Sequence, residues 1–173
     1  MRTIRLLNTP TGMFFILCDA NGAIETGWLE MAGAMGPRSR EELNEATRND
    51  TIQEELVQRL NVAFDGHRVA FDDIETPPGT AFQRACWRAT RAIPHGETRS
   101  YAELAEMAGY PRAARAVGQA MRRNPLPMVV PCHRVTAANG LGGFGGEGAK
   151  GTWASIKERL LHSERLNCTA FSS

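Results

Sequence analysis

The chain has 173 residues, 42% hydrophobic and 23% charged, enough to bury the core of one domain or of two small ones. No stretch approaches the ~20 consecutive apolar residues of a membrane span, and the first residues lack the apolar core of a secretory signal. The four cysteines are widely spaced without a Cys-x-x-Cys pair, which argues against a disulfide framework and structural zinc. We therefore expect a globular protein of the cytoplasm, or of the nucleus in a eukaryote, without a membrane partner.

The net charge of +1 hides an asymmetry between the two halves of the chain. Residues 1–79 carry 7 basic and 13 acidic residues, whereas residues 80–173 carry 13 basic and 6 acidic residues. The stretch 107–146 contains no acidic residue but five arginines: Arg112, Arg115, Arg122, Arg123 and Arg134. Arginines clustered without acids are typical of a surface that binds a polyanion, although charge alone does not exclude a basic patch without a partner.

The first third of the chain reads as short strands joined by turns. Residues 2–8 and 13–18 are predicted strands on either side of a Thr-Pro-Thr-Gly turn. Asn21-Gly22 is a strong hairpin signal before a third strand over residues 23–30. The polar stretch 33–50 is predicted to be a loop.

A helix is predicted after this loop, with Thr51 and Glu54 as a capping box and Gly66 at its end. Residues 69–74 have the composition of a further strand. Residues 76–79, Thr-Pro-Pro-Gly, look like a linker, so we place a boundary there.

Beyond the linker the pattern becomes helical. Thr80 caps one predicted helix, and a capping box at Ser100 opens a second helix that ends at Gly109. Pro111 at a first helical position then predicts a third helix over residues 112–123. Two short helices joined by a tight glycine turn indicate a helix-turn-helix.

The helix over residues 112–123 is rich in alanine, with arginines at either end. Small side chains let a helix approach another surface closely, which fits either a nucleic-acid groove or packing inside the protein. Asn124-Pro125 ends the helix, and residues 126–130 are predicted to form a strand that leads directly to Cys132.

Cys132 lies in the run Pro131-Cys132-His133-Arg134-Val135. A thiol fixed by a preceding proline and an adjacent imidazole is typical of a cysteine placed for reaction. Its thiolate would be the nucleophile, so a neighbouring base or cation must activate it. The alternative from the residues alone is a buried core cysteine.

With these features the chain resembles the O6-alkylguanine-DNA alkyltransferases, also called methylated-DNA–protein-cysteine methyltransferases. The motifs that carry the resemblance occur in the family's order: Phe82-Gln83 with Trp87, residues 93–98, Ser100-Tyr101, residues 113–118, Asn124-Pro125, residues 131–135 and Leu160-Leu161 with Glu164. The resemblance implies an α/β (α+β) fold whose small N-terminal antiparallel sheet domain, ribonuclease-H-like, covers residues 1–76. A mostly helical domain with the helix-turn-helix, over residues 80–167, would bind DNA and accept the alkyl group.

The implied reaction is transfer of an alkyl group from O6-alkylguanine, and less well from O4-alkylthymine, to a cysteine of the protein. Cys132 matches the acceptor, and because a thioether is not hydrolysed under mild conditions the enzyme would react once. His133 matches the base that takes the thiol proton through a water, and Glu164 the acid that orients this histidine. Asn124 matches the residue that braces the active-site turn, and Tyr101 the hydroxyl that donates to the departing purine.

The implied partner is double-stranded DNA with alkylated bases, bound through the minor groove with the damaged nucleotide rotated out of the stack. Arg115 matches the arginine that fills the gap, and Tyr101, Ala102, Tyr110 and Ala114 are further candidate DNA contacts. We expect little sequence specificity and strongly salt-dependent binding. No phosphate loop or metal-spaced ligand set occurs, so no cofactor is expected. A monomer is expected, and cooperativity on DNA is left open.

The chain departs from the family pattern at two places, and the first of them leaves the preferred size of the alkyl group open. Residues 142–146 match the glycine-rich loop that covers the alkyl pocket, but residues 147–156, with Trp153, look like an insertion. Arg123 stands where glycine is common.

Three other functions are weighed against this one. An alkyltransferase-like protein that binds the lesion without reacting would lack the acceptor cysteine. A helix-turn-helix transcription regulator would read bases with side chains that the alanines of residues 112–123 do not offer. A cysteine hydrolase would turn over repeatedly.

Overall fold

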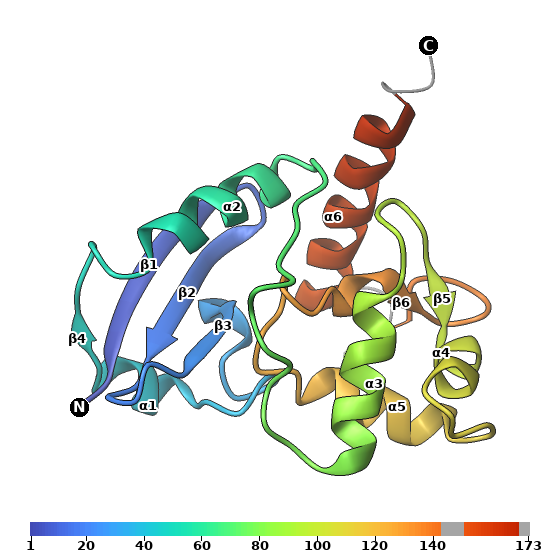
Figure 1. Ribbon diagram of the computed structural model, residues 1–173. Helices are drawn as coiled ribbons and strands as arrows, with labels where there is room; N and C mark the ends of the chain where they lie inside the picture. The colour runs from blue at the N-terminus through green and yellow to red at the C-terminus, as the bar shows by residue number, and fades with distance from the viewer. Residues whose placement is uncertain (143–150, 170–173) are drawn as a thin grey trace.

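The computed structural model describes residues 1–142 and 151–169. An N-terminal sheet with its helices occupies one side of the molecule, and the remaining helices gather on the other side (Figure 1). This mixed arrangement confirms the predicted α/β class. Within the described residues, no helix combines the length and the apolar composition needed to cross a bilayer.

The sheet has the strand order β3-β2-β1-β4. β1 (Thr3–Thr9), β2 (Gly12–Cys18) and β3 (Ile24–Trp28) pair antiparallel, which confirms the three predicted strands. The fourth strand, β4 (Thr47–Arg48), was not predicted and pairs parallel with β1, so the sheet is not purely antiparallel. β2 lies between two strands and is covered on both faces, which explains its unbroken apolar run.

The predicted loop over residues 33–50 also contains a short helix, α1 (Arg40–Asn44). Ser39 and Glu42 form its capping box, a signal that is visible in the sequence. The next helix, α2 (Glu54–Phe64), begins two residues later than predicted, because its N-cap is Gln53, in a left-handed conformation, and not Thr51. The Thr51 hydroxyl donates to Asn49 (2.8 Å) and caps nothing, so the predicted capping box there is wrong.

The strand predicted over residues 69–74 is also wrong. The carbonyl oxygens of Phe71 and Ile74 accept from the Arg91 guanidinium, at 2.6 and 2.7 Å, instead of from a neighbouring strand. Arg91 lies at the end of α3 (Ala81–Arg91), so these hydrogen bonds connect the segment before the linker to the first helix that follows the linker.

In the second half, α4 (Tyr101–Met107) and α5 (Ala114–Arg122) form the predicted helix-turn-helix. The capping boxes at Thr80 and Ser100 are both present. α5 begins at Ala114 and not at residue 112, because Arg112 has a φ of 72°, which no α-helix accommodates. A two-stranded parallel sheet of β5 (Arg99–Ser100) and β6 (Val135–Thr136) was not predicted.

Residues 126–130 do not form the predicted strand. They fold into a turn in which the Val130 N–H donates to the Leu126 carbonyl (2.8 Å) and Met128 has a φ of 75°. The chain then enters a 3₁₀ turn, Cys132–Arg134. Two successive tight turns thus carry the cysteine back toward α5.

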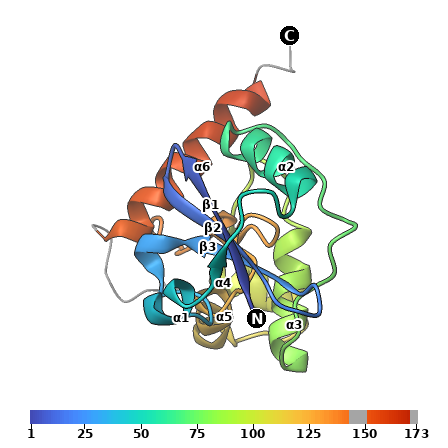
Figure 2. The same ribbon diagram turned by 90° about the vertical axis from the view of Figure 1, so that its left-hand side faces the viewer.

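Apolar contacts join the sheet to the C-terminal helix, α6 (Thr152–Thr169). The rings of Trp28 and Trp153 meet edge to face, with centroids 5.5 Å apart, and Phe14 packs against Phe64 of α2 at 5.0 Å. Both α2 and α6 lie beside the sheet when it is viewed from its side (Figure 2). One buried cluster runs from Phe14 to the helical half, so the core is continuous across residues 76–80. The division into units 1–76 and 80–167 stays a prediction.

Candidate active site

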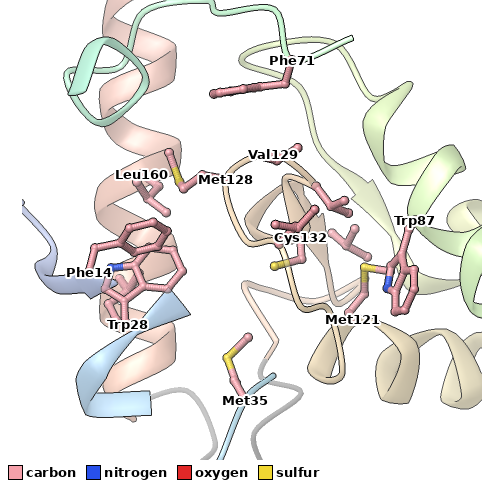
Figure 3. Packing of buried hydrophobic residues seen from close by; sticks show 14 of the residues in the cluster. Phe14, Trp28, Met35, Phe71, Trp87, Met121, Met128, Val129, Cys132 and Leu160 are labelled. Atoms are coloured by element: carbon pink, nitrogen blue, oxygen red, sulfur yellow. The ribbon is translucent and has the colours of Figure 1, made fainter. Parts of the chain in front are cut away.

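Cys132 is buried, with 1% of its surface exposed. Figure 3 shows its side chain among apolar neighbours that include Met121. Burial raises the pKa of the Cys132 thiol to about 11. The Asn124 side chain, the backbone N–H groups of Cys132 and His133 and the Lys157 charge all oppose this rise. The resting group is therefore a thiol, and it reacts as a thiolate only if a base removes its proton.

His133 and Glu164 form a buried pair. The distance from His133 Nε2 to Glu164 Oε1 is 2.7 Å, and the two residues are 1% and 5% exposed. Glu164 also accepts from the guanidinium of Arg134 at 3.0–3.2 Å and from the backbone N–H of Gly96 at 3.0 Å. These contacts, His133 foremost, overcome burial and hold the pKa of Glu164 well below its ordinary value.

The partner of Nε2 fixes the tautomer of His133. An ionised carboxylate only accepts, so Nε2 carries the hydrogen and Nδ1 has the free lone pair. Burial lowers the pKa of His133 against the attraction of Glu164, so the ring is neutral at pH 7. Nδ1 is buried and has no hydrogen-bond partner among the described residues. This histidine has the protonation state of a general base.

Asn124 fixes the turn that precedes the cysteine. Its side-chain amide donates to the Val130 carbonyl at 2.9 Å, and its side-chain oxygen accepts from the Leu126 N–H at 3.0 Å. The residue is fully buried. These contacts are those expected of the bracing residue in the sequence analysis.

Tyr101 opens α4 and faces the same region from the helical side. Burial, and next to it the charge of a Cys132 thiolate, raises the pKa of Tyr101 well above its ordinary value. A hydroxyl that stays protonated can donate a hydrogen bond. A Cβ added at Gly118 of α5 would lie 4.0 Å from the ring, an ordinary van der Waals contact, so α5 packs beside Tyr101 without requiring a glycine at this position.

The sequence analysis missed Lys157, which is fully buried on α6. Its ammonium donates to the Leu141 carbonyl at 2.7 Å and lies 5.8 Å from the centre of the Tyr101 ring. Burial lowers the pKa of Lys157 to about 8, and attraction to a Cys132 thiolate opposes that shift. The signal was present, because Lys157 stands inside the apolar helical pattern of Trp153, Ile156, Leu160 and Leu161.

The predicted DNA contacts lie on the helix-turn-helix. Arg115 is exposed in the first turn of α5, beside the half-buried Ala114. Ala102 on α4 is exposed, and Tyr110 in the intervening turn is 39% exposed with its ring against Phe82. The alternative of internal packing holds for the opposite side of α5, where Val117, Ala120 and Met121 are buried.

Only part of the five arginines that were expected to bind a polyanion is exposed on the surface. Arg112, Arg115 and Arg123 are exposed. Arg122 donates to the Ala34 carbonyl at 2.9 Å, and Arg134 is committed to Glu164. The expectation of a polyanion-binding role is therefore wrong for Arg134, whose guanidinium nitrogens are all engaged inside the protein, whereas for the half-buried Arg122 it stays a prediction.

Two further predictions lie mainly outside the described residues. Only Gly142 of the pocket-covering loop 142–146 is described, and residues 147–150 of the apparent insertion are not. Trp153, in the described part of that insertion, packs on Trp28 of the sheet.

A helix-turn-helix beside a buried Cys-His-Glu set defines a DNA-binding protein with a nucleophilic cysteine. Residues 81–166 match the family described as 6-O-methylguanine DNA methyltransferase, DNA binding domain. The chain is 37% identical over 160 residues to a methylated-DNA–protein-cysteine methyltransferase of Methanosarcina acetivorans, covering 92% of this chain and 96% of that one. The chain belongs to the methylated-DNA–protein-cysteine methyltransferase family.

Solved structures agree with this assignment. The fold is similar to the crystal structure of Mycobacterium tuberculosis O6-methylguanine methyltransferase, with a TM-score of 0.79, 32% identity and coverage of 99% of this chain and 100% of that one. It is also similar to M. tuberculosis OGT in complex with DNA, with a TM-score of 0.76, 34% identity and coverage of 95% and 93%.

Proposed function

We propose that this protein repairs DNA by direct reversal, transferring the alkyl group of O6-alkylguanine, and less well of O4-alkylthymine, to the sulfur of its own Cys132. The observation that carries the proposal is the buried set in which Glu164 fixes the tautomer of His133 next to Cys132. Membership of the methyltransferase family supports the same reaction.

The reaction is a displacement at a saturated carbon. His133 Nδ1 takes the thiol proton, through a water, and Glu164 stabilises the imidazolium that results. The Cys132 sulfur then forms a bond to the alkyl carbon while the bond from that carbon to O6 breaks. The electron pair of the broken bond passes to the purine, to which the Tyr101 hydroxyl donates. The product is a thioether, so each molecule reacts once.

The alkylated base lies inside the duplex, so the nucleotide must be rotated out, at a cost on the order of a few kcal/mol. We place α5 in the minor groove, with Arg115 in the gap that the base leaves. The small Ala114 beside it permits close approach of the helix. One chain supplies every residue of this scheme, and we propose that it acts as a monomer.

Intact mass spectrometry tests the reaction. After incubation with duplex DNA that carries O6-methylguanine, we expect one added methyl group per molecule, located on Cys132 by peptide mapping, because Cys132 directly precedes the histidine that Glu164 orients. Cys132→Ala should gain none but still bind the duplex. Repeated turnover, as in a hydrolase, or a methyl group on another residue would contradict the proposal. No transfer at all with normal binding would indicate a lesion-binding protein that does not react.

Arg115→Ala tests the flipping step. We expect repair of duplex DNA to slow by about tenfold, because no side chain then fills the gap that the flipped nucleotide leaves in the base stack. The loss should be smaller on free O6-methylguanine, which needs no flipping. Single-turnover rates on both substrates measure the difference.

Arg123→Ala is the matched control, because Arg123 is also exposed and stands just after α5. It should lower the salt dependence of DNA binding by about one ion, as Arg115→Ala does, without slowing flipping. If Arg115→Ala slows both substrates equally, Arg115 has no wedge role.

A further inference from the structure

A second cysteine–histidine pair lies outside the active site. Cys168, near the end of α6, has its sulfur 3.1 Å from Nδ1 of His95, in the loop that follows α3. The other ring nitrogen of His95, Nε2, is 2.9 Å from the Gly66 carbonyl oxygen. Cys168 is the only cysteine that is not buried, since Cys18, Cys86 and Cys132 are all inside the core.

The Gly66 carbonyl determines what His95 can do. A carbonyl only accepts, so Nε2 must carry the hydrogen and Nδ1 is the acceptor when the ring is neutral. The Cys168 thiol can therefore donate its hydrogen to this nitrogen, 3.1 Å away, and the His95 carbonyl oxygen, at 3.5 Å, is a second acceptor. A thiol, a base that takes its proton and a third group that orients the base are the parts of an activated nucleophile.

The pair is connected to the active-site acid through Gly96. Cys168 lies one helical turn beyond Glu164, and its sulfur packs so closely on Gly96 that an added Cβ would overlap with it. The backbone N–H of the same Gly96 donates to Glu164 Oε2 at 3.0 Å. We infer that a group attached to this half-buried sulfur shifts Gly96 or His95 and so weakens a hydrogen bond to the carboxylate that holds His133.

We propose that Cys168 is a modification site that forms mixed disulfides with small-molecule disulfides. His95 Nδ1 takes the thiol proton, and the Cys168 sulfur attacks one sulfur of the disulfide. A new S–S bond forms as the old one breaks, and the leaving thiolate receives the proton from His95. Cys168 is oxidised and half of the small disulfide is reduced. The adduct weakens the active site through Gly96, a consequence that rests on the function proposed above.

Oxidised glutathione is the probe. The full-length protein is incubated with it, and the first cysteine modified is identified by peptide mapping. We expect Cys168, reacting about tenfold faster than a synthetic peptide of residues 160–169, which has the same local sequence but lacks His95. At neutral pH an ordinary thiol is only a few per cent ionised. A base that takes the thiol proton can therefore raise the rate of disulfide exchange by about tenfold. His95→Gln, which cannot take the proton, should bring the rate down to that of the peptide.

Two results would overturn the proposal: equal rates for the protein and the peptide, or first modification at a core cysteine. The peptide comparison holds even if His95→Gln folds poorly. The link to the active site has its own readout. Glutathione at Cys168 should slow methyl transfer by about tenfold, reversibly with a reductant, and leave Cys168→Ala unaffected. Because thiol exchange is measured without DNA, its result stands whether or not the protein transfers methyl groups.

Discussion

Glu164→Gln is expected to slow methyl transfer by about 10²- to 10⁴-fold, the range over which a positioned base and its orienting acid act. Glutamine has nearly the same shape, but it cannot stabilise an imidazolium by charge. Its amide can also donate to Nε2 of His133, which would leave Nδ1 carrying the hydrogen and unable to take one from Cys132. Single-turnover transfer to O6-methylguanine DNA, at saturating DNA, measures the loss.

The same substitution should destabilise the fold by about 3 kcal/mol, because it leaves the partly buried Arg134 without its counter-charge. The pH dependence has a definite sign. The pKa of Glu164 is lowered in the folded state, so its stabilisation is fully present above the unfolded value of about 4.3 and is lost as the pH falls through the folded value. The difference in stability between wild type and variant should therefore shrink on acidification below about pH 4.

Glu158→Gln is the control, since Glu158 is exposed on the same helix. It should change neither the transfer rate nor the unfolding free energy measurably. If Glu164→Gln lowers stability but leaves the transfer rate unchanged, the carboxylate only binds Arg134 and has no part in the proton transfer from Cys132 to His133.

The elements predicted correctly are those whose signals are local. Thr80 and Ser100 with their partners three residues on, and the Asn21-Gly22 turn, each specify a structure from within a few residues. The same kind of signal failed at Thr51. There Asn49 lies two residues upstream and takes the threonine hydroxyl, so the helix starts after Gln53.

The segments predicted wrongly are those whose backbone partners come from far along the chain. The stretch 69–74 has the composition of a strand, but a side chain from α3 satisfies its carbonyl groups. Residues 126–130 are apolar because they are buried, and periodicity cannot distinguish a buried turn from a buried strand. Their exact path depends on the amide of Asn124, which no hydrophobic pattern reveals.

At the site, the resemblance identified Cys132, His133 and Glu164, and the structure brings the last two together. The resemblance did not reveal that Arg134 also forms an ion pair with Glu164, because an arginine among other arginines is interpreted as a surface charge. Lys157 was missed for the opposite reason. Its position in an apolar pattern is conspicuous, but only the fold shows that the charge lies near a sulfur.

Lys157→Met is expected to stabilise the protein by about 2 kcal/mol at pH 7 while slowing methyl transfer at least about tenfold. Burial lowers the pKa of Lys157 from 10.5 to about 8, so holding its charge at pH 7 costs on the order of 3 kcal/mol. Methionine fills similar space without that cost. The Leu141 carbonyl then loses its hydrogen-bond donor, which destabilises the variant by about 1 kcal/mol and leaves the net stabilisation of about 2 kcal/mol. The rate falls because the lysine charge opposes the rise in the pKa of Cys132.

Denaturant unfolding from pH 7 to 10.5 separates this effect from simple repacking. A lowered pKa means that the unfolded chain keeps a proton which the folded chain has lost, so between about pH 8 and 10.5 Lys157 makes wild type gain stability as the pH rises. The variant lacks this gain, and its advantage should vanish by pH 10.5. The raised pKa of Cys132 acts in the opposite direction above pH 9, but it acts in both proteins.

Arg159→Met, at an exposed position of the same helix, controls for the loss of one positive charge and should show neither change. A Lys157→Met protein that is less stable than wild type at pH 7, with an unaltered transfer rate, would mean that the lysine serves packing alone. The expected result is a higher unfolding free energy together with a slower methyl transfer. It would mean that the protein keeps a buried cation at a cost in stability because the cation stabilises the Cys132 thiolate.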